Sequence, residues 1–189
     1  MESPASSPSN FTSPAPGQPA VFIDRDGTLM EEVCYCRDPE KVRLIGDAAQ
    51  ALRSLRESGY RTVLVTNQAG IARGLISYAE YLAVHARLLE LLGPETLDAT
   101  YMCPDGPGVP STHRKPAPGM LLQARDELQL DLSRSWMIGD KPIDIQCGTH
   151  AGVRSILVQT GYGREAGECG AVHVAADVVE AARWILQQG

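Results

Sequence analysis

The stretch that decides the fold of this chain is VFIDRDGT, residues 21–28. A short apolar segment leads directly into two carboxylates that are one residue apart, and a glycine follows them. Because alternate residues of an extended chain face the same way, Asp24 and Asp26 can point to one place while Arg25 points elsewhere. Two carboxylates 4 Å apart repel each other by roughly 4 kcal/mol at an effective dielectric constant of about 20. The pair therefore indicates a bound cation or a proton on one of them, and both suit phosphoryl transfer. Asp-x-Asp-Gly is also a common turn, so this stretch alone does not separate a site from a simple strand exit.

Strand-like and helix-like segments alternate along the rest of the chain. We expect further strands at 61–65, 99–103, 135–138 and 155–158, and helices at about 47–59, 77–92, 120–129, 143–151 and 177–188. Asp47 is placed as an N-cap, and Ser77 with Glu80 forms the pattern of a capping box. This alternation predicts an α/β fold in three layers, with a mainly parallel sheet and helices on both faces.

Composition bounds the function classes. The chain has 189 residues, a length that suits one domain. Its net charge of −6 argues against a nucleic-acid binder. No apolar run is long enough to cross a membrane. Its five cysteines, an odd number without an export signal, indicate reduced thiols and a cytoplasmic protein. Residues 1–19 are rich in Ser and Pro, so we expect a disordered leader followed by a single domain over 20–189.

Polar residues follow three of the expected strands. Asp24 and Asp26 follow the first, Thr66 and Asn67 the second, and Asp140 the fourth. The carboxyl ends of parallel strands lie along one edge of a sheet, where ligands bind in open α/β folds. A loop that leaves a strand on the same side carries Lys115. Each residue alone has an ordinary structural explanation, such as a helix N-cap for Asp140, and only their combination favours an active site.

The order of these residues resembles the four motifs of the haloacid dehalogenase (HAD) superfamily, over residues 20 to about 163. The resemblance implies a HAD-like Rossmannoid fold and a phosphatase. We expect Asp24 to attack phosphorus and form an aspartyl-phosphate, and Asp26 to protonate the leaving oxygen and later deprotonate water. Thr66 and Lys115 would hold the phosphoryl oxygens. Mg²⁺ would be bound by the side chains of Asp24 and Asp140 and, as the resemblance implies, by the backbone carbonyl of Asp26. Asp144 is interpreted as a structural or helix-start residue rather than a ligand.

The segments between the motifs are too short for an inserted domain, so we expect no cap domain and an open site. The finer pattern, DRDGT at 24–28, TNQAGIARG at 66–74, RKP at 114–116 and GDK at 139–141, resembles the D-glycero-D-manno-heptose 1,7-bisphosphate phosphatases. Histidinol-phosphate phosphatases share several of these segments, but GIARG favours the heptose branch. By that resemblance Arg114 joins the catalytic residues. The implied substrate contacts are Glu32, Val33, Cys34, Tyr35, Thr66, Asn67, Gln68, Ala69, Arg114, Lys115 and Lys141.

One segment departs from the family pattern. These phosphatases usually carry a zinc loop with Cys-x-His and Cys-x-Cys, whereas the positions here are Cys103, Asp105, Ser111 and His113. Serine is not a normal zinc ligand, and structural zinc takes four nitrogen or sulfur donors. We therefore expect no bound zinc.

The leading hypothesis is a Mg²⁺-dependent phosphatase that removes the 7-phosphate of heptose 1,7-bisphosphate. Its alternatives are a histidinol-phosphate or other small-ester phosphatase, and a non-catalytic domain that binds phosphosugars or a protein. The open site suits a monomer whose partner is a small phosphorylated sugar. Two further patterns are discounted: CYC at 34–36 as a redox or metal site, and GYGREAG at 161–167 as a dinucleotide fingerprint whose third glycine falls one residue late.

Overall fold

The computed structural model describes residues 17–188 of the chain. Most of the expected leader lies outside this range, but its last residues are tied to the domain. Gln18 forms a bridge with Leu130, and its side chain donates to the carbonyl of Gly59 and accepts from Arg61, each at 2.9 Å. The expectation that disorder extends to residue 19 is therefore wrong at this end, because these bonds hold the chain before the first strand begins.

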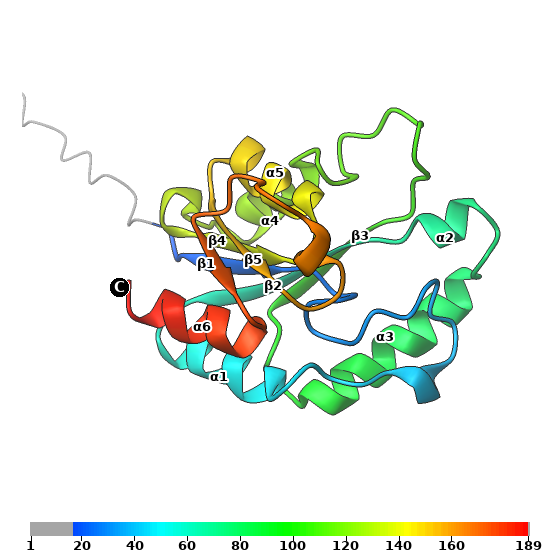
Figure 1. Ribbon diagram of the computed structural model, residues 1–189, viewed down its shortest axis with the longest axis horizontal. Helices are drawn as coiled ribbons and strands as arrows, with labels where there is room; N and C mark the ends of the chain where they lie inside the picture. Colours follow the sequence, from blue (N-terminus) through cyan, green and yellow to red (C-terminus); the bar gives the residue numbers. More distant parts are fainter. Residues whose placement is uncertain (1–16, 189) are drawn as a thin grey trace, which may run out of the picture.

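A parallel sheet of six strands forms the middle layer (Figure 1). Its strand order is β3-β2-β1-β4-β5-β6, and every neighbouring pair is parallel. The strands are β1 (Ala20–Ile23), β2 (Arg61–Asn67), β3 (Ala99–Cys103), β4 (Trp136–Gly139), β5 (Arg154–Val158) and β6 (His173–Ala175). The sequence did not indicate β6, an edge strand of three residues in which only Ala175 is buried.

Helices cover both faces of the sheet. Figure 1 shows α1 (Ala48–Glu57), α3 (Tyr78–Leu92) and α6 (Val178–Leu186) on one face, with α4 (Gly119–Leu128) and α5 (Pro142–Ala151) on the other. The three-layer α/β prediction is thus confirmed. A short α2 (Ala69–Ala72) after β2 and three 3₁₀ turns, at Pro39–Lys41, Leu132–Arg134 and Gly163–Glu165, were not anticipated.

The helix starts follow from local chemistry. Asp47 accepts a hydrogen bond from the backbone N–H of Gln50, and Ser77 and Glu80 form both bonds of a capping box, as predicted. Each cap satisfies N–H groups that have no partner within the helix. These helices therefore begin where the sequence pattern placed them.

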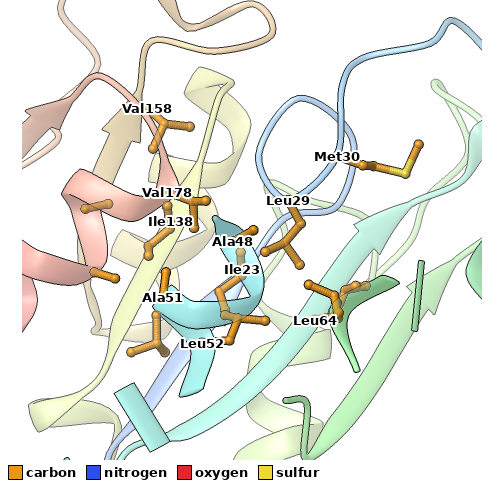
Figure 2. Packing of buried hydrophobic residues seen from close by; sticks show 14 of the residues in the cluster. Ile23, Leu29, Met30, Ala48, Ala51, Leu52, Leu64, Ile138, Val158 and Val178 are labelled. Atoms are coloured by element: carbon orange, nitrogen blue, oxygen red, sulfur yellow. The ribbon is translucent and has the colours of Figure 1, made fainter. Parts of the chain in front are cut away.

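The core has two parts, one on each face of the sheet, and β1 contributes to both. Val21 and Ile23 pack toward α1, α3 and α6, whereas Ala20 and Phe22 pack toward α4 and α5. Figure 2 shows the first part, where Ile23 lies among Leu52 of α1 and residues of the neighbouring strands. Because β1 is buried on both faces, its carboxyl end is fixed in the centre of the sheet.

The segments that follow β1 and β2 contain only loops, one 3₁₀ turn and the helices α1, α2 and α3. Within residues 17–188, no second domain covers the carboxyl edge of the sheet, in agreement with the prediction of a capless enzyme. None of the helices in this range combines the length and the apolar character needed to cross a membrane.

Candidate active site

Three carboxylates converge at the carboxyl ends of the two central strands. Asp24 follows β1, Asp140 follows β4, and Asp144 lies in the first turn of α5. Each offers one oxygen, and these oxygens all lie within 4.8 Å of one another. All three residues are buried. The structure thus brings together Asp24 and Asp140 as predicted, and adds Asp144, which the sequence interpretation had set apart as structural.

Lys115 reaches this group from the loop between β3 and α4. Its Nζ lies 2.6 Å from Asp24 Oδ1 and 2.7 Å from Asp144 Oδ1, and donates to the carbonyl of Val65 at 3.0 Å. The side chain is only 2 % exposed. Burial alone would lower the pKa of Lys115, but attraction to Asp144 and Asp24 raises it above its ordinary value. The amine is therefore a fixed positive charge at the base of the site.

One ammonium does not neutralise three buried carboxylates. Burial raises the pKa of Asp24 to about 7, against the opposing pull of Lys115. Burial likewise raises the pKa of Asp140 to about 6, against the opposing pull of Lys141. Asp140 Oδ1 is buried and accepts no hydrogen bond from residues 17–188, although Lys141 Nζ lies 3.6 Å away. Hard divalent cations prefer oxygen donors of this kind, so the donor set fits such an ion.

Two loops enclose Asp140 with backbone rather than side chains. Gly27 and Gly161 both have positive φ angles, of 83° and 52°. A Cβ atom at either position would lie within 2.4 Å of Asp140 Oδ2. Thr160 Oγ1 donates to the carbonyl of Gly27 at 2.6 Å, and the N–H of Tyr162 donates to Asp140 Oδ2 at 2.9 Å. The loop after β5 thus orients Oδ2 of Asp140, whereas Oδ1 accepts no hydrogen bond from the described part of the chain.

Asp26 lies beside the cluster rather than within it. Arg25 donates to both of its carboxylate oxygens at 2.9 Å, and Gln68 Nε2 donates to Oδ2 at 2.9 Å. The Asp26 side chain is 16 % exposed, so a ligand can reach it. Arg25 was expected to point elsewhere, which is wrong: it is buried, lines the cavity, and packs 5.4 Å from the ring centre of Tyr81. The guanidinium turns back to its neighbour because that carboxylate compensates its buried charge.

The cavity above these groups has a volume of about 290 Å³. Most of the predicted contact residues line it: Asp24, Asp26, Glu32, Val33, Cys34, Tyr35, Asn67, Gln68, Ala69, Arg114, Lys115 and Lys141. Thr66 does not line it; this side chain is buried and accepts a hydrogen bond from Gln68 Nε2 at 2.8 Å. Asp140 also lies below the lining.

Sequence reasoning missed several lining residues, among them Ile143, Asp144 and Tyr162. Tyr162 belongs to the GYG segment that had been interpreted only as a poor dinucleotide fingerprint. Lys141 Nζ lies 4.7 Å from the centre of its ring and 3.1 Å from Glu32 Oε2. The signal that could have placed Tyr162 in the site was its position just after β5. That strand ends at the same edge of the sheet as β1 and β4, which carry Asp24 and Asp140.

The altered zinc-loop positions do not form a metal-ligand set. Cys103 Sγ donates to Asp105 Oδ2 at 3.5 Å and lies 3.7 Å from Ser111 Oγ, while His113 Nδ1 lies 3.1 Å from the hydroxyl of Thr112. Over residues 17–188, Asp24, Asp140 and Asp144 are the one group of three or more potential ligands that converges. The absence of zinc stays a prediction for metal analysis.

Comparisons with known proteins find relatives over most of the chain. The model of the HAD-hydrolase-like family matches residues 112–181. The D-glycero-D-manno-heptose-1,7-bisphosphate 7-phosphatase of Thermosynechococcus vestitus is 43% identical over 187 residues, which covers 89% of this chain and 95% of that protein. The D-glycero-beta-D-manno-heptose-1,7-bisphosphate 7-phosphatase of Yersinia pestis is 36% identical and covers 89% of each chain.

A solved structure shares the fold closely. The D,D-heptose 1,7-bisphosphate phosphatase from B. bronchiseptica, crystallised with magnesium and phosphate, superposes with a TM-score of 0.82 at 32% identity. The match covers 90% of this chain and 99% of that one.

Proposed function

Since the chain belongs to the HAD-like hydrolases, in the branch of the heptose 1,7-bisphosphate 7-phosphatases, we propose that it removes the 7-phosphate of D-glycero-D-manno-heptose 1,7-bisphosphate with Mg²⁺. The observation that carries the proposal is the convergence of Asp24, Asp140 and Lys115 at the base of one open cavity. A binding domain would not require a buried, unneutralised carboxylate group beneath its ligand, because that arrangement costs stability.

Asp24 is the proposed nucleophile. One of its oxygens faces Lys115, and a carboxylate oxygen attacks phosphorus, so that an O–P bond to Asp24 forms while the P–O bond to the sugar breaks. Asp26 gives a proton to the leaving sugar oxygen. It then takes a proton from the water that attacks the aspartyl-phosphate, which releases phosphate and restores Asp24. The partial exposure of Asp26 supports this role, because both the leaving group and water must reach it.

Fixed charges hold the transferred group. Lys115 is buried beside Asp24 and would bind a phosphoryl oxygen as negative charge develops there, whereas Thr66 does not line the cavity and receives no direct role. The side chains of Asp24 and Asp140 and the backbone carbonyl of Asp26 would hold Mg²⁺, which supplies further positive charge to the phosphoryl group when bound. Asp140 Oδ1, which is buried and has no hydrogen-bond donor among the described residues, supports this assignment.

The cavity walls suit a substrate with two phosphates. Arg114 and Lys141 line it in addition to Lys115, so that cations are available for both groups. Glu32, Val33, Cys34, Tyr35 and Ala69 also line the cavity, and we assign them to the sugar hydroxyls. We assign the enzyme to the cytoplasm, since its five cysteines are free thiols and suit a reducing compartment. An open site without a cap suits a monomer.

The test is phosphate release from a panel that contains heptose 1,7-bisphosphate, histidinol phosphate and other sugar phosphates, with and without Mg²⁺. We expect the highest kcat/KM on the heptose bisphosphate and no turnover in EDTA. A preference for histidinol phosphate would move the chain to the neighbouring branch. Release from no member of the panel would favour a phosphosugar-binding domain.

A further inference from the structure

Asn67 was expected to contact the substrate, but its amide is engaged elsewhere. Asn67 Nδ2 donates to the backbone carbonyl of Lys115 at 3.0 Å, and the backbone N–H of Lys115 donates to Asn67 Oδ1 at 3.0 Å. Both ends of one side-chain amide thus bind both polar groups of one backbone residue. This pairing imitates the hydrogen bonds between two strands, and it fixes the position and rotation of the Lys115 backbone.

From this geometry we propose that Asn67 is a positioning residue for Lys115 in the phosphatase reaction, and not a residue that binds the sugar. The inference rests on the proposed function for its kinetic consequence. Asn67 is the last residue of β2, and its own backbone pairs with Cys103 of β3, so it is part of the rigid sheet. Lys115 lies in the irregular segment 104–118, which has no such framework of its own.

The remaining anchors of this segment do not replace Asn67. Arg114 donates from its N–H to Ser111 Oγ at 3.0 Å and from Nη1 to the carbonyl of Asp105 at 2.8 Å, and both partners lie in the same loop. On the α5 side, Cys147 and His150 contact the carbonyls of Ala117 and Pro116, beyond Lys115. Asn67 is the contact that joins the Lys115 backbone itself to the sheet.

The ammonium end of Lys115 meets the same strand. Lys115 Nζ donates to the carbonyl of Val65, two residues before Asn67 on β2. Strand β2 therefore holds Lys115 at its backbone and at its charged tip, and sets where the ammonium lies relative to Asp24. A displacement of about 1 Å at a reacting centre can lower a rate by about 100-fold, so loss of the backbone contact should be seen in kcat.

The experiment is a double-mutant cycle with the wild type, Asn67→Leu, Lys115→Met and the double variant. With intact Lys115, we expect Asn67→Leu to lower kcat roughly tenfold to 100-fold and to change KM by less than about threefold. With Lys115→Met, the same substitution should change kcat and KM by less than about twofold, because the residue it positions is gone. Gln123→Leu, which removes an exposed amide on α4, is the matched control and should leave all constants unchanged.

Two results would overturn the proposal. One is an equal loss in both backgrounds, which would mean that Asn67 acts independently of Lys115. The other is a rise in KM with unchanged kcat, which would mean that it binds the substrate. If the leucine variant does not fold, Asn67→Ala replaces it in the same double-mutant cycle, because alanine adds no apolar volume.

A binding measurement on the same four proteins separates this inference from the proposed function. Their affinity for inorganic phosphate, measured by calorimetry in Mg²⁺, should show the same non-additivity. If the wild type released no phosphate from any ester, the proposed function would fail, while the phosphate cycle would still decide whether Asn67 acts through Lys115.

Discussion

Two clusters of charged side chains lie at opposite edges of the sheet, and they use aspartate in opposite ways. At the carboxyl edge, Asp24 and Asp144 contact the ammonium of Lys115, and Asp140 lies beside them; we call these four residues the site cluster. At the amino edge, Asp98 precedes β3 and binds Arg56 of α1 together with Arg61 and the N–H of Thr62 on β2; we call this the base cluster.

The electrostatic balance of the two clusters differs. In the base cluster burial opposes ionisation, but the hydrogen bonds from Thr62, Arg56 and Arg61 outweigh it and lower the pKa of Asp98. In the site cluster burial prevails, and the pKa values of Asp24 and Asp140 are raised. The base cluster is therefore complete within the protein, whereas the site cluster is completed by a ligand. Stability should depend on the first and activity on the second.

The largest expected effect is the loss of activity, without loss of stability, when Asp24 of the site cluster is replaced. Asp24→Asn should lower kcat by at least about 10⁴-fold, because it removes the proposed nucleophile. Its free energy of unfolding in EDTA should stay equal or rise, since the substitution removes one of three crowded carboxylates. Phosphate release and chemical denaturation measure both quantities. A variant that retained substantial Mg²⁺-dependent activity would refute the assignment.

The pH dependence of stability is the next way to test the comparison. In the folded, metal-free chain the pKa of Asp24 is about 7 and that of Asp140 about 6, so between about pH 4 and 7 the folded state binds more protons than the unfolded state. The free energy of unfolding should therefore fall as pH rises through this window, with a slope of the order of 1 kcal/mol per pH step for each carboxyl group that stays protonated only in the folded state. Denaturation in EDTA at several pH values measures the slope.

Asp24→Asn is the control, because it should make the free energy of unfolding depend less steeply on pH. Saturating Mg²⁺ should reduce the pH dependence of the wild type as well. Asp98 acts in a different window and with the opposite sign. Because its folded pKa is lowered, its contribution is present above its unfolded pKa and is lost as pH falls through the folded value. A free energy of unfolding that rises between about pH 4 and 7 in EDTA would contradict the account of the site cluster.

At the base cluster the expected effect is on stability. Asp98→Asn should lower the free energy of unfolding by about 1–3 kcal/mol, because two guanidinium groups lose a charged partner whose side chain is only 8 % exposed. The kcat of the folded enzyme should not change. Asp126→Asn is a matched control at an exposed pair with Arg125, and should have no measurable effect. Equal losses of stability in both variants would show that burial of Asp98 contributes nothing.

The smallest expected effect concerns the loop that carries Arg114. A zinc-selective chelator should change neither Tm nor kcat, since Cys103 and Ser111 contact each other directly and serine is a poor zinc ligand. Elemental analysis of the purified protein should find no stoichiometric zinc. A clear drop in Tm on chelation would place a second metal centre in this loop.

The sequence predicted the parts of the molecule that depend on local pattern. Short apolar runs located the first five strands, and the caps at Asp47 and Ser77 located two helix starts. The parallel order then implied that Asp24 and Asp140 share one edge, as the structure shows. Each of these inferences uses only neighbouring residues and one rule of topology.

What it did not predict depends on contacts between distant segments. β6 is too short to show a period, and exists because it pairs with β5. The inward turn of Arg25 depends on Tyr81 of α3, and the place of Asp144 depends on Lys115. The engagement of Asn67 with Lys115, 48 residues later, likewise has no local signature. Such long-range pairings are decided by packing rather than by pattern.

The ammonium of Lys115 has a consequence for the order of assembly. Because it lies between Asp24 and Asp144, these two carboxylates have a counter-ion in the folded chain before any metal binds. The pocket can thus form first and take up its metal afterwards, unlike small zinc domains that are unfolded until the ion arrives. When magnesium is scarce, the enzyme should then be folded but inactive, and it should regain activity when the ion binds.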